Sequence, residues 1–495
     1  MSHVMKVAHS VSWNIFTGLG SRAIGLVGTL LLTRFIAPDE YGLVSAALIT
    51  VMTAAYLTNM QFGQYIIVKG YREQGVAFHA AVTHVSLGWA AIVIAFLGRD
   101  ILEPWLRAPG MGRFMAGFVL AAAMDSVSAV PEKILARDLR FRVIALTKGL
   151  GEVLYTAVSL SLVMMLGGMA LVVGSIARSV LILAVFLVKT DRVWLRRVPW
   201  SWALIREMLR YSSPLALANM TDFATSRWDN LLIGTLHGPG VMGTYNLAYN
   251  LSDTSTLSVA QHIADVLFPS FVRLEPRQRG KALIRAVSAM AFVVFPLGLG
   301  LGVVAPKVVA AVFTAKWALI APMLTVLSVY AAIQPPAWTF RAFYKAQGRT
   351  TFVMIAGMVR LALMLAGIAT IGRVGPLWAC AAVDLAFIGH FLLMWSGLRG
   401  SHPEVMWPAA RAVLQAFGAC VPMIAAVLLV QWTERLFFPL PPVVALGIEI
   451  PVGVMGYAAG AALFARSTAT DLLGIVAQLM RPYRGGPDQA TAGTV

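Results

Sequence analysis

Long apolar stretches alternate with short polar breaks along almost the whole chain. Most of these stretches are about 20 residues long, the length of helix that crosses ~30 Å of hydrocarbon. The pattern predicts an all-α polytopic membrane protein with fourteen transmembrane helices. Their expected positions are residues 10–36, 41–65, 77–97, 113–131, 143–166, 168–188, 212–236, 241–268, 286–306, 317–339, 350–371, 375–397, 409–431 and 442–465.

The composition agrees with a chain that is mostly surrounded by lipid. Hydrophobic residues make up 59% and charged residues 12% of the sequence, whereas a soluble domain carries about 25% charged residues. The two cysteines, Cys380 and Cys420, lie inside apolar stretches and lack metal-ligand spacing. We therefore expect neither a disulfide nor a metal site. The first helix lacks the small-residue cleavage site of a signal peptide and is expected to remain in the protein.

Lysine and arginine are distributed unevenly between alternate loops. With the N-terminus in the cytoplasm, 26 of the 39 basic residues fall in loops or tails on the cytoplasmic side and 8 on the opposite side. This asymmetry is what the positive-inside rule describes, so both termini are predicted to be cytoplasmic. Anionic lipid headgroups account for the net charge of +17, and no nucleic-acid partner is expected.

Two halves of the chain resemble each other. Leu31, Pro38 and Gly42 recur as Leu232, Pro239 and Gly243, at an offset of 201 residues. Near the start of each half, Asn14, Ser21 and Arg22 recur as Asn219, Ser226 and Arg227, at an offset of 205 residues. Six helices per half give both halves the same orientation, so we expect parallel repeats with a substrate site between them.

The expected domains follow from this repeat. They are an N-terminal six-helix bundle (1–190), a cytoplasmic interfacial linker (191–211), a C-terminal six-helix bundle (212–398), two extra transmembrane helices (399–466) and a cytoplasmic tail (467–495).

The opening of the chain has a recognisable pattern. Ser12-Trp13-Asn14, Gly18 and Ser21-Arg22, followed by the run 31–42 (LLTRFIAPDEYG), resemble the start of polysaccharide transport proteins. These are the Wzx-like oligosaccharide flippases of the MOP (multidrug/oligosaccharidyl-lipid/polysaccharide) superfamily. Further similarity lies at Lys316-Trp317, Arg341-Ala342 and 346–349 (AQGR). The resemblance covers about the first 400 residues, and it is specific for the family but not for any sugar.

The resemblance implies a V-shaped pair of six-helix bundles with two additional helices. Such proteins reside in the bacterial inner membrane, where they move undecaprenyl-pyrophosphate-linked repeat units from the cytoplasmic to the periplasmic leaflet by alternating access. They serve exopolysaccharide, capsule or O-antigen synthesis. The implied partners are the lipid-linked oligosaccharide, membrane lipids, and polymerase and chain-length or export machinery. No adenine-nucleotide motif is evident, so we expect no cofactor and no direct use of ATP.

Charged residues inside predicted helices are candidates for the transport site, because a base at the bilayer centre costs about 2.5–3.5 kcal/mol on insertion scales. Arg22 and Arg227 occupy corresponding positions on the first helix of each half and could face each other. Their guanidinium groups suit the geometry of a pyrophosphate. Alternatively, each snorkels or pairs with a nearby acid. Arg360, in the middle of a predicted helix, is either a cavity residue or a structural one.

Polar residues form stripes beside these arginines. They recur at three- and four-residue steps, which place them on one helix face, and could line a wet cavity together with Asn14. The alternative is hydrogen bonding between helices. Asp222 or Asp229 could also take part in cation coupling. The stripes comprise Asn219, Asp222, Ser226, Asp229 and Asn230 on one helix, and Tyr245, Asn246, Tyr249, Asn250 and Asp253 on the next.

Two further ion pairs are expected within the N-terminal half. Lys148 and Glu152 are four residues apart and could pair along one helix, whereas Arg178 would pair with an acid on a neighbouring helix.

Two other functional classes compete with a flippase. A membrane polysaccharide polymerase or ligase usually needs a large external loop, but the longest here, about residues 98–112, is short and carries no catalytic constellation. We therefore expect a transporter and not an enzyme. An exporter of small solutes or drugs from the same superfamily would typically have twelve helices and lack the opening pattern.

Overall fold

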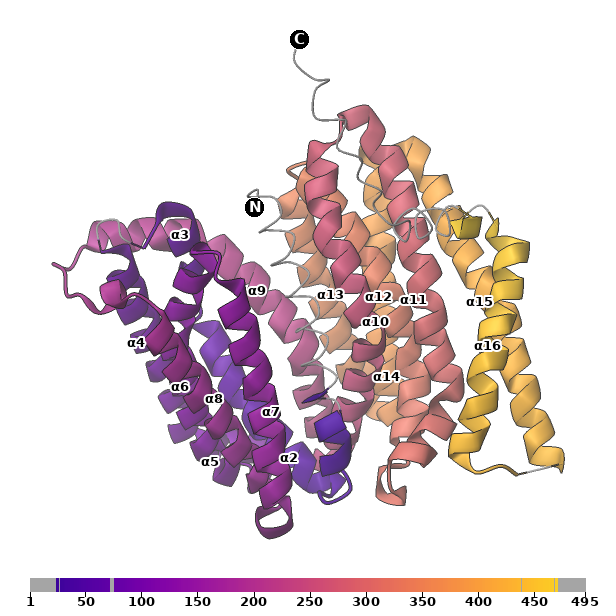
Figure 1. Cartoon of the computed structure of the whole chain (residues 1–495), viewed down its shortest axis with the longest axis horizontal. Helices are drawn as coiled ribbons and strands as arrows, with labels where there is room; N and C mark the ends of the chain where they lie inside the picture. Colours follow the sequence, from indigo (N-terminus) through magenta and orange to yellow (C-terminus); the bar gives the residue numbers. More distant parts are fainter. Residues whose placement is uncertain (1–23, 26, 72–74, 438, 467, 471–495) are drawn as a thin grey trace, which may run out of the picture.

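The computed structural model describes residues 24–25, 27–71, 75–437, 439–466 and 468–470. Their regular secondary structure is entirely helical (Figure 1). Eleven helices in this part of the chain are long and apolar enough to cross a membrane. The predicted class, an all-α polytopic membrane protein, is therefore confirmed.

The helices follow one another with short connections. The first group comprises α2 (Pro38–Leu57), α3 (Phe62–Lys69), α4 (Val76–Leu97), α5 (Arg99–Trp105), α6 (Gly112–Arg137), α7 (Phe141–Leu166), α8 (Met169–Lys189) and η1 (Arg192–Leu195). The second comprises α9 (Trp202–His237), α10 (Pro239–Arg273), α11 (Pro276–Val312), η2 (Ala315–Trp317), α12 (Ile320–Ala346), α13 (Thr350–Thr370), η3 (Ile371–Val374), α14 (Pro376–Ser396) and η4 (Gly397–Gly400). Two more helices, α15 (Pro403–Phe437) and α16 (Pro442–Phe464), complete the chain that the structure describes.

The eleven apolar helices correspond to all but three of the fourteen predicted spans. Most of the first predicted span, 10–36, lies outside the described residues. The other two spans correspond to α9 and α10, which are 36 and 35 residues long. Both helices carry the polar stripes, and these lower their mean hydropathy below that of a typical membrane span. The number fourteen is thus not confirmed, although α9 and α10 are long enough to cross a bilayer.

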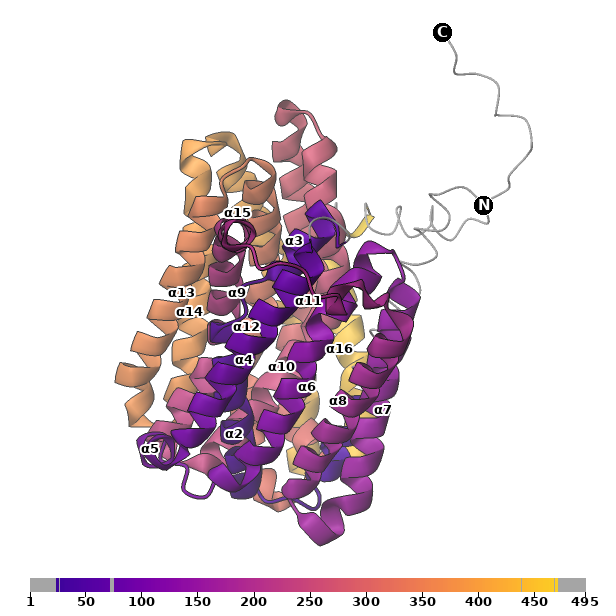
Figure 2. The same ribbon diagram turned by 90° about the vertical axis from the view of Figure 1, so that its left-hand side faces the viewer.

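Figure 1 shows the helices arranged as two groups that meet at one end and diverge toward the other. They meet where α2 and α10 begin, whereas α15 and α16 lie at the outer edge beside α11. The view from the side agrees with this arrangement (Figure 2). Helix α9 belongs to both groups: Leu204 and Met208 pack with Phe62 and Tyr65 of α3, and Ile233 packs in the core of the second group.

The starts of α2 and α10, which carry the repeated proline and glycine, contact each other where the two groups meet. Proline starts both helices, because its fixed φ suits the first helical position, where no N–H is needed. A Cβ atom on Gly42 would lie 2.5 Å from the carbonyl carbon of Pro239, and closer still to its oxygen. A Cβ atom on Gly243 would overlap the carbonyl oxygen of Pro38 in the same way. The two glycines therefore allow a reciprocal backbone contact that any side chain would block.

Contacts from η2 close the same end of the molecule. The indole Nε1 of the buried Trp317 donates a hydrogen bond to the carbonyl oxygen of Thr33 over 2.8 Å. The Nζ of Lys316 donates to the carbonyl oxygen of Arg34 over 3.1 Å. The rings of Tyr41 and Trp317 pack edge to face with centroids 5.9 Å apart. These contacts join the two groups at the closed end, where residues 33–42 and 314–317 lie together.

Candidate functional site

The polar stripes of α9 and α10 meet in a buried seam. Tyr245 donates a hydrogen bond to Oδ2 of Asp229 over 2.6 Å, and Asn246 donates to Oδ1 of Asn230 over 2.9 Å. The side-chain amide of Asn250 in turn donates to Asn246 over 2.9 Å. Asp229 and Asn230 are almost fully buried. In this part of the stripe the polar groups satisfy one another, as buried polar groups in membrane helices usually do.

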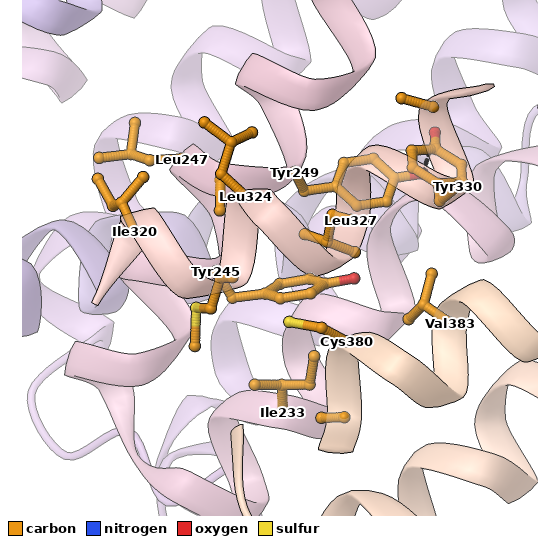
Figure 3. Packing of buried hydrophobic residues seen from close by; sticks show 14 of the residues in the cluster. Ile233, Tyr245, Leu247, Tyr249, Ile320, Leu324, Leu327, Tyr330, Cys380 and Val383 are labelled. Atoms are coloured by element: carbon orange, nitrogen blue, oxygen red, sulfur yellow. Dashed lines mark hydrogen bonds between the residues drawn. The ribbon is translucent and has the colours of Figure 1, made fainter. Parts of the chain in front are cut away.

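A second set of hydrogen bonds joins α10 to α12 and α14. The hydroxyl of Tyr330 lies 2.6 Å from Oδ1 of Asp253 and 2.8 Å from the hydroxyl of Tyr249. The backbone N–H of Tyr330 donates to Asp384 over 3.0 Å. Figure 3 shows Tyr245, Tyr249 and Tyr330 among the aliphatic side chains of this core. These residues hold the second group of helices together.

A cavity of about 530 Å³ opens between α9, α12, α13 and α14. It lies toward the diverging end of the molecule, because α12 runs about 30 Å from Ile320, near the closed end, to Arg341. The lining residues are Pro214, Leu215, Ala218, Asn219, Thr221, Asp222, Arg341, Lys345, Thr350, Thr351, Val353, Met354, Gly357, Arg360 and His390. Its charged lining consists of three bases and one acid, which gives a formal charge of +2 with histidine neutral.

Asp222 bridges the two arginines of this cavity. Its Oδ2 lies 3.1 Å from a guanidinium nitrogen of Arg341, and its Oδ1 lies 3.1 Å from one of Arg360. Arg360 is held in place by the fold: its side chain is only 4% exposed, and its guanidinium lies 5.2 Å from the ring centroid of Phe387. The side chain of Asp222, by contrast, is 45% exposed. One donor of Arg360, the buried Nε–H, has no hydrogen-bond partner in the part of the chain that the structure describes.

The start of α13 adds hydrogen-bond donors to the same cavity. Thr350 and Thr351 are the first two residues of that helix and line the cavity. Within the described ranges no side chain caps this helix N-terminus, so its first N–H groups and the positive end of its dipole can interact with an anion. Lys345, the base in the last turn of α12, lines the same space.

Arg227 lies apart from this cavity, where α9 faces α2. Its neighbour Trp228 donates a hydrogen bond to Thr53 over 3.3 Å, and Phe223 stacks on Tyr56 with ring centroids 4.1 Å apart. The half-buried Arg227 forms no ion pair with a carboxylate among the residues that the structure describes.

The sequence matches a family model over much of this architecture. The model of the family described as "Polysaccharide biosynthesis protein" covers residues 31–322, more than half of the chain. The chain belongs to this family. The matched residues include the starts of α2 and α10, the polar stripes of α9 and α10, and Trp317.

Curated relatives of this polysaccharide biosynthesis protein are similar along most of their length. The succinoglycan biosynthesis transport protein ExoT of Rhizobium meliloti is 21% identical over 437 residues, which cover 84% of this chain and 88% of ExoT. The lipopolysaccharide biosynthesis protein WzxC of Escherichia coli is 23% identical over 337 residues, 66% of this chain and 68% of WzxC.

Solved structures share the fold at lower identity. The lipid II flippase MurJ in its inward closed conformation aligns over 91% of this chain and 98% of MurJ, with a TM-score of 0.73 and 14% identity. An inward-facing multidrug resistance MATE family transporter of the MOP superfamily aligns over 79% and 96%, with a TM-score of 0.55 and 16% identity. The family protein therefore has the MOP fold that the opening pattern led us to expect.

The predicted site residues do not all lie in one place. Asn219, Asp222 and Arg360 line the cavity, whereas Asp229, Asn230, Tyr249, Asn250 and Asp253 belong to the hydrogen-bonded network of α10 and its neighbours. Ser226 donates back to the carbonyl oxygen of Asp222 on its own helix. Arg227 lies between α9 and α2, and Asn14 and Arg22 lie outside the described residues.

Sequence reasoning missed the two bases that α12 contributes. The predicted spans 317–339 and 350–371 left Arg341 and Lys345 in the loop between them. Helix α12 instead continues to Ala346 and carries both bases into the cavity lining. The spacing of Arg341 and Lys345, four residues apart on one helix face, was the available signal.

One predicted ion pair in the N-terminal half is wrong and the other is confirmed. Lys148 does not pair with Glu152 on its own helix; its Nζ lies 2.8 Å from Glu132 on α6. Glu152 instead pairs with Arg178 of α8 over 3.1 Å, as expected for an acid on a neighbouring helix. The partners of Lys148 and Glu152 thus come from the neighbouring helices α6 and α8, and not from the same face of α7.

Proposed function

We propose that this chain is a flippase that moves undecaprenyl-pyrophosphate-linked oligosaccharide repeat units from the cytoplasmic to the periplasmic leaflet. Transport would proceed by alternating access and would supply exopolysaccharide, capsule or O-antigen synthesis. Membership of the polysaccharide biosynthesis family supports this proposal, as do relatives named for the transport or biosynthesis of such polymers. The likeness to MurJ supports a fold suited to the task.

The observation that carries the proposal is the basic cavity in a chain of which 59% of the residues are hydrophobic. A lipid-linked oligosaccharide combines a polyprenyl tail, a diphosphate and a polar sugar. The cavity offers two arginines, one lysine and three threonine hydroxyls within about 530 Å³. This volume lies in the usual range of small-molecule sites, roughly 300–1,000 Å³, so it suits a headgroup or its first sugars while the lipid tail stays in the bilayer.

The proposal includes an orientation. The positive-inside rule, applied to the loops, would place the closed end at the periplasm and the diverging end at the cytoplasm. The cavity would then face the leaflet from which substrate is loaded. Both termini would be cytoplasmic in the bacterial inner membrane. Bundles 1–190 and 212–398 would form the moving halves, with 191–211 as linker, 399–466 as accessory helices and 467–495 as tail.

The remaining site assignments also belong to this proposal. Arg227 would contact substrate between the halves together with Arg22 and Asn14. Arg360, Asn219 and Asp222 would do so in the cavity. Ser226, Asn230, Tyr249, Asn250 and Asp253 would become accessible when the halves rearrange. A polymerase and chain-length or export machinery would consume the product.

The test is the leaflet in which lipid-linked oligosaccharide accumulates when the gene is deleted in its host. We expect accumulation in the cytoplasmic leaflet, reversed by the intact chain supplied in trans. Accumulation in the periplasmic leaflet would indicate a later step such as polymerisation. Absence of any accumulation would favour an exporter of small solutes or drugs from the same superfamily. Either of these two results would contradict the flippase proposal.

A further inference from the structure

The two arginines of the cavity are positioned more rigidly than the carboxylate that joins them. Arg360 is buried against Phe387, and the side chain of Arg341 is 23% exposed. Asp222 reaches both from the open side of the cavity, with nearly half of its side chain exposed. A small rotation of the Asp222 side chain would therefore uncover both guanidinium groups without moving a helix.

The charge in the cavity is not balanced by Asp222 alone. Arg341, Lys345 and Arg360 contribute three positive charges against one negative charge, and the side chain of Arg360 is almost fully buried. An uncompensated charge in such surroundings is costly. A diphosphate that links two organic groups carries about two negative charges at neutral pH, so it would neutralise this excess.

The donors also match the geometry of such a ligand. Two guanidinium groups that share one carboxylate are close enough to share a phosphate, because both present planar forks suited to bidentate contacts. The Nε–H of Arg360, which has no partner among the described residues, supplies a further buried donor. The uncapped start of α13, with the hydroxyls of Thr350 and Thr351, faces the same space.

We propose that Arg341, Arg360, Lys345 and the start of α13 form a diphosphate-binding site, and that Asp222 occupies it as a competing internal anion. This inference rests on the proposed function and names the part of the substrate that this cavity recognises. In the empty site Asp222 neutralises one charge and keeps the two arginines together. Binding of the diphosphate releases Asp222, and the return of Asp222 to the arginines helps to expel the ligand.

Inorganic pyrophosphate is a suitable probe, because it lacks both sugar and lipid. The full chain in nanodiscs of zwitterionic lipid would be titrated with it by calorimetry. Removing the competitor in Asp222→Asn should tighten binding about tenfold or more, whereas Arg341→Gln should weaken it about tenfold or more. Arg411→Gln removes an exposed arginine from α15, which does not line the cavity, and should leave binding unchanged.

The opposite signs distinguish a competitor from a structural support. If Asp222 served only to hold the arginines in place, Asp222→Asn would weaken binding as Arg341→Gln does, and the proposal would be wrong. Unchanged affinity in both variants would also overturn it. Should Asp222→Asn fail to fold, Lys345→Gln together with Arg341→Gln still tests the site, since both must weaken binding.

A further measurement distinguishes a diphosphate site from a site for lipid headgroups. Anionic phospholipid in the nanodiscs supplies singly charged phosphates. If this lipid abolishes pyrophosphate binding, the site binds ordinary headgroups and the diphosphate assignment fails. The leaflet assay with the intact chain is independent of these variants. A flippase that shows no effect of Asp222 on pyrophosphate binding would refute this inference and leave the proposed function standing.

Discussion

The reciprocal glycine contact at the closed end gives a sharp prediction. In Gly42→Ala, the new methyl group would lie 2.5 Å from the carbonyl carbon of Pro239, whereas ordinary contacts begin near 3.4 Å. The starts of α2 and α10 must therefore separate by about 0.9 Å or more. Both neighbours are backbone atoms within helices, so no side-chain rotation relieves the overlap. Overpacking of this kind costs about 1–3 kcal/mol.

This cost falls on the closed end and should shift the conformational equilibrium. A change of about 1–3 kcal/mol alters the ratio of two states by about 5- to 150-fold. Spin labels at Ala37→Cys and Ala315→Cys, both exposed near the contact of Lys316 with Arg34, would report the separation by pulsed electron resonance. We expect Gly42→Ala to move the distance distribution toward longer values in nanodiscs.

Controls follow from the other glycines. Gly149→Ala on α7 adds a methyl group with nothing within 4 Å and should leave the distances unchanged. Gly243→Ala on α10 meets backbone atoms of Pro38 and Gly42 and should reproduce the shift. If Gly42→Ala and Gly243→Ala both give the distribution of the unmodified protein, this backbone contact does not hold the end closed.

Three further substitutions test polar contacts, two within the second part of the chain and one across the closed end. Lys307→Met leaves the carboxylate of Glu434, which is 7% exposed, without its 2.7 Å partner, and should lower stability by about 3–5 kcal/mol; a melting temperature equal to that of the unmodified protein would contradict this. Tyr330→Phe removes the 2.6 Å hydrogen bond to Asp253 and should cost about 1.5–3 kcal/mol, measured by denaturant titration. Trp317→Phe deletes its 2.8 Å hydrogen bond across the closed end and should lengthen the same spin-label distances; unchanged distances would argue against its role.

The local features of the chain were predictable from its sequence. The apolar stretches fix helix formation and approximate helix ends, because a segment in lipid must satisfy its backbone hydrogen bonds internally. Proline at positions 38 and 239 marks the starts of α2 and α10. The repeat identified Gly42 and Gly243 as equivalent positions. This equivalence predicted that α2 and α10 would begin in the same way. It did not predict that the two helix starts would contact each other.

The charged site was predictable only in part. Asp222 and Arg360 stood out because charges within apolar helices are expensive. Their partner Arg341 did not, because it was assigned to a loop beyond the end of its helix. In the same way, spacing along α7 suggested a pair of Lys148 with Glu152, whereas Glu132 on α6 and Arg178 on α8 lie closer to those two side chains.

By itself the sequence determined which segments form long helices and which of these are apolar enough to cross a membrane. It also showed which polar positions inside those helices carry a high energetic cost. These properties depend on neighbours within a few turns and on transfer from water, so periodicity and composition reveal them. The tertiary structure decided the partner of each polar group. Asp229 and Asp222 lie on the same stripe. Asp229 is buried and accepts a hydrogen bond from Tyr245, whereas Asp222 pairs with two arginines at an open cavity. That difference depends on which helices pack against each part of α9: Tyr245 lies on the next helix, 16 positions from Asp229, whereas Arg341 and Arg360 lie 119 and 138 positions from Asp222.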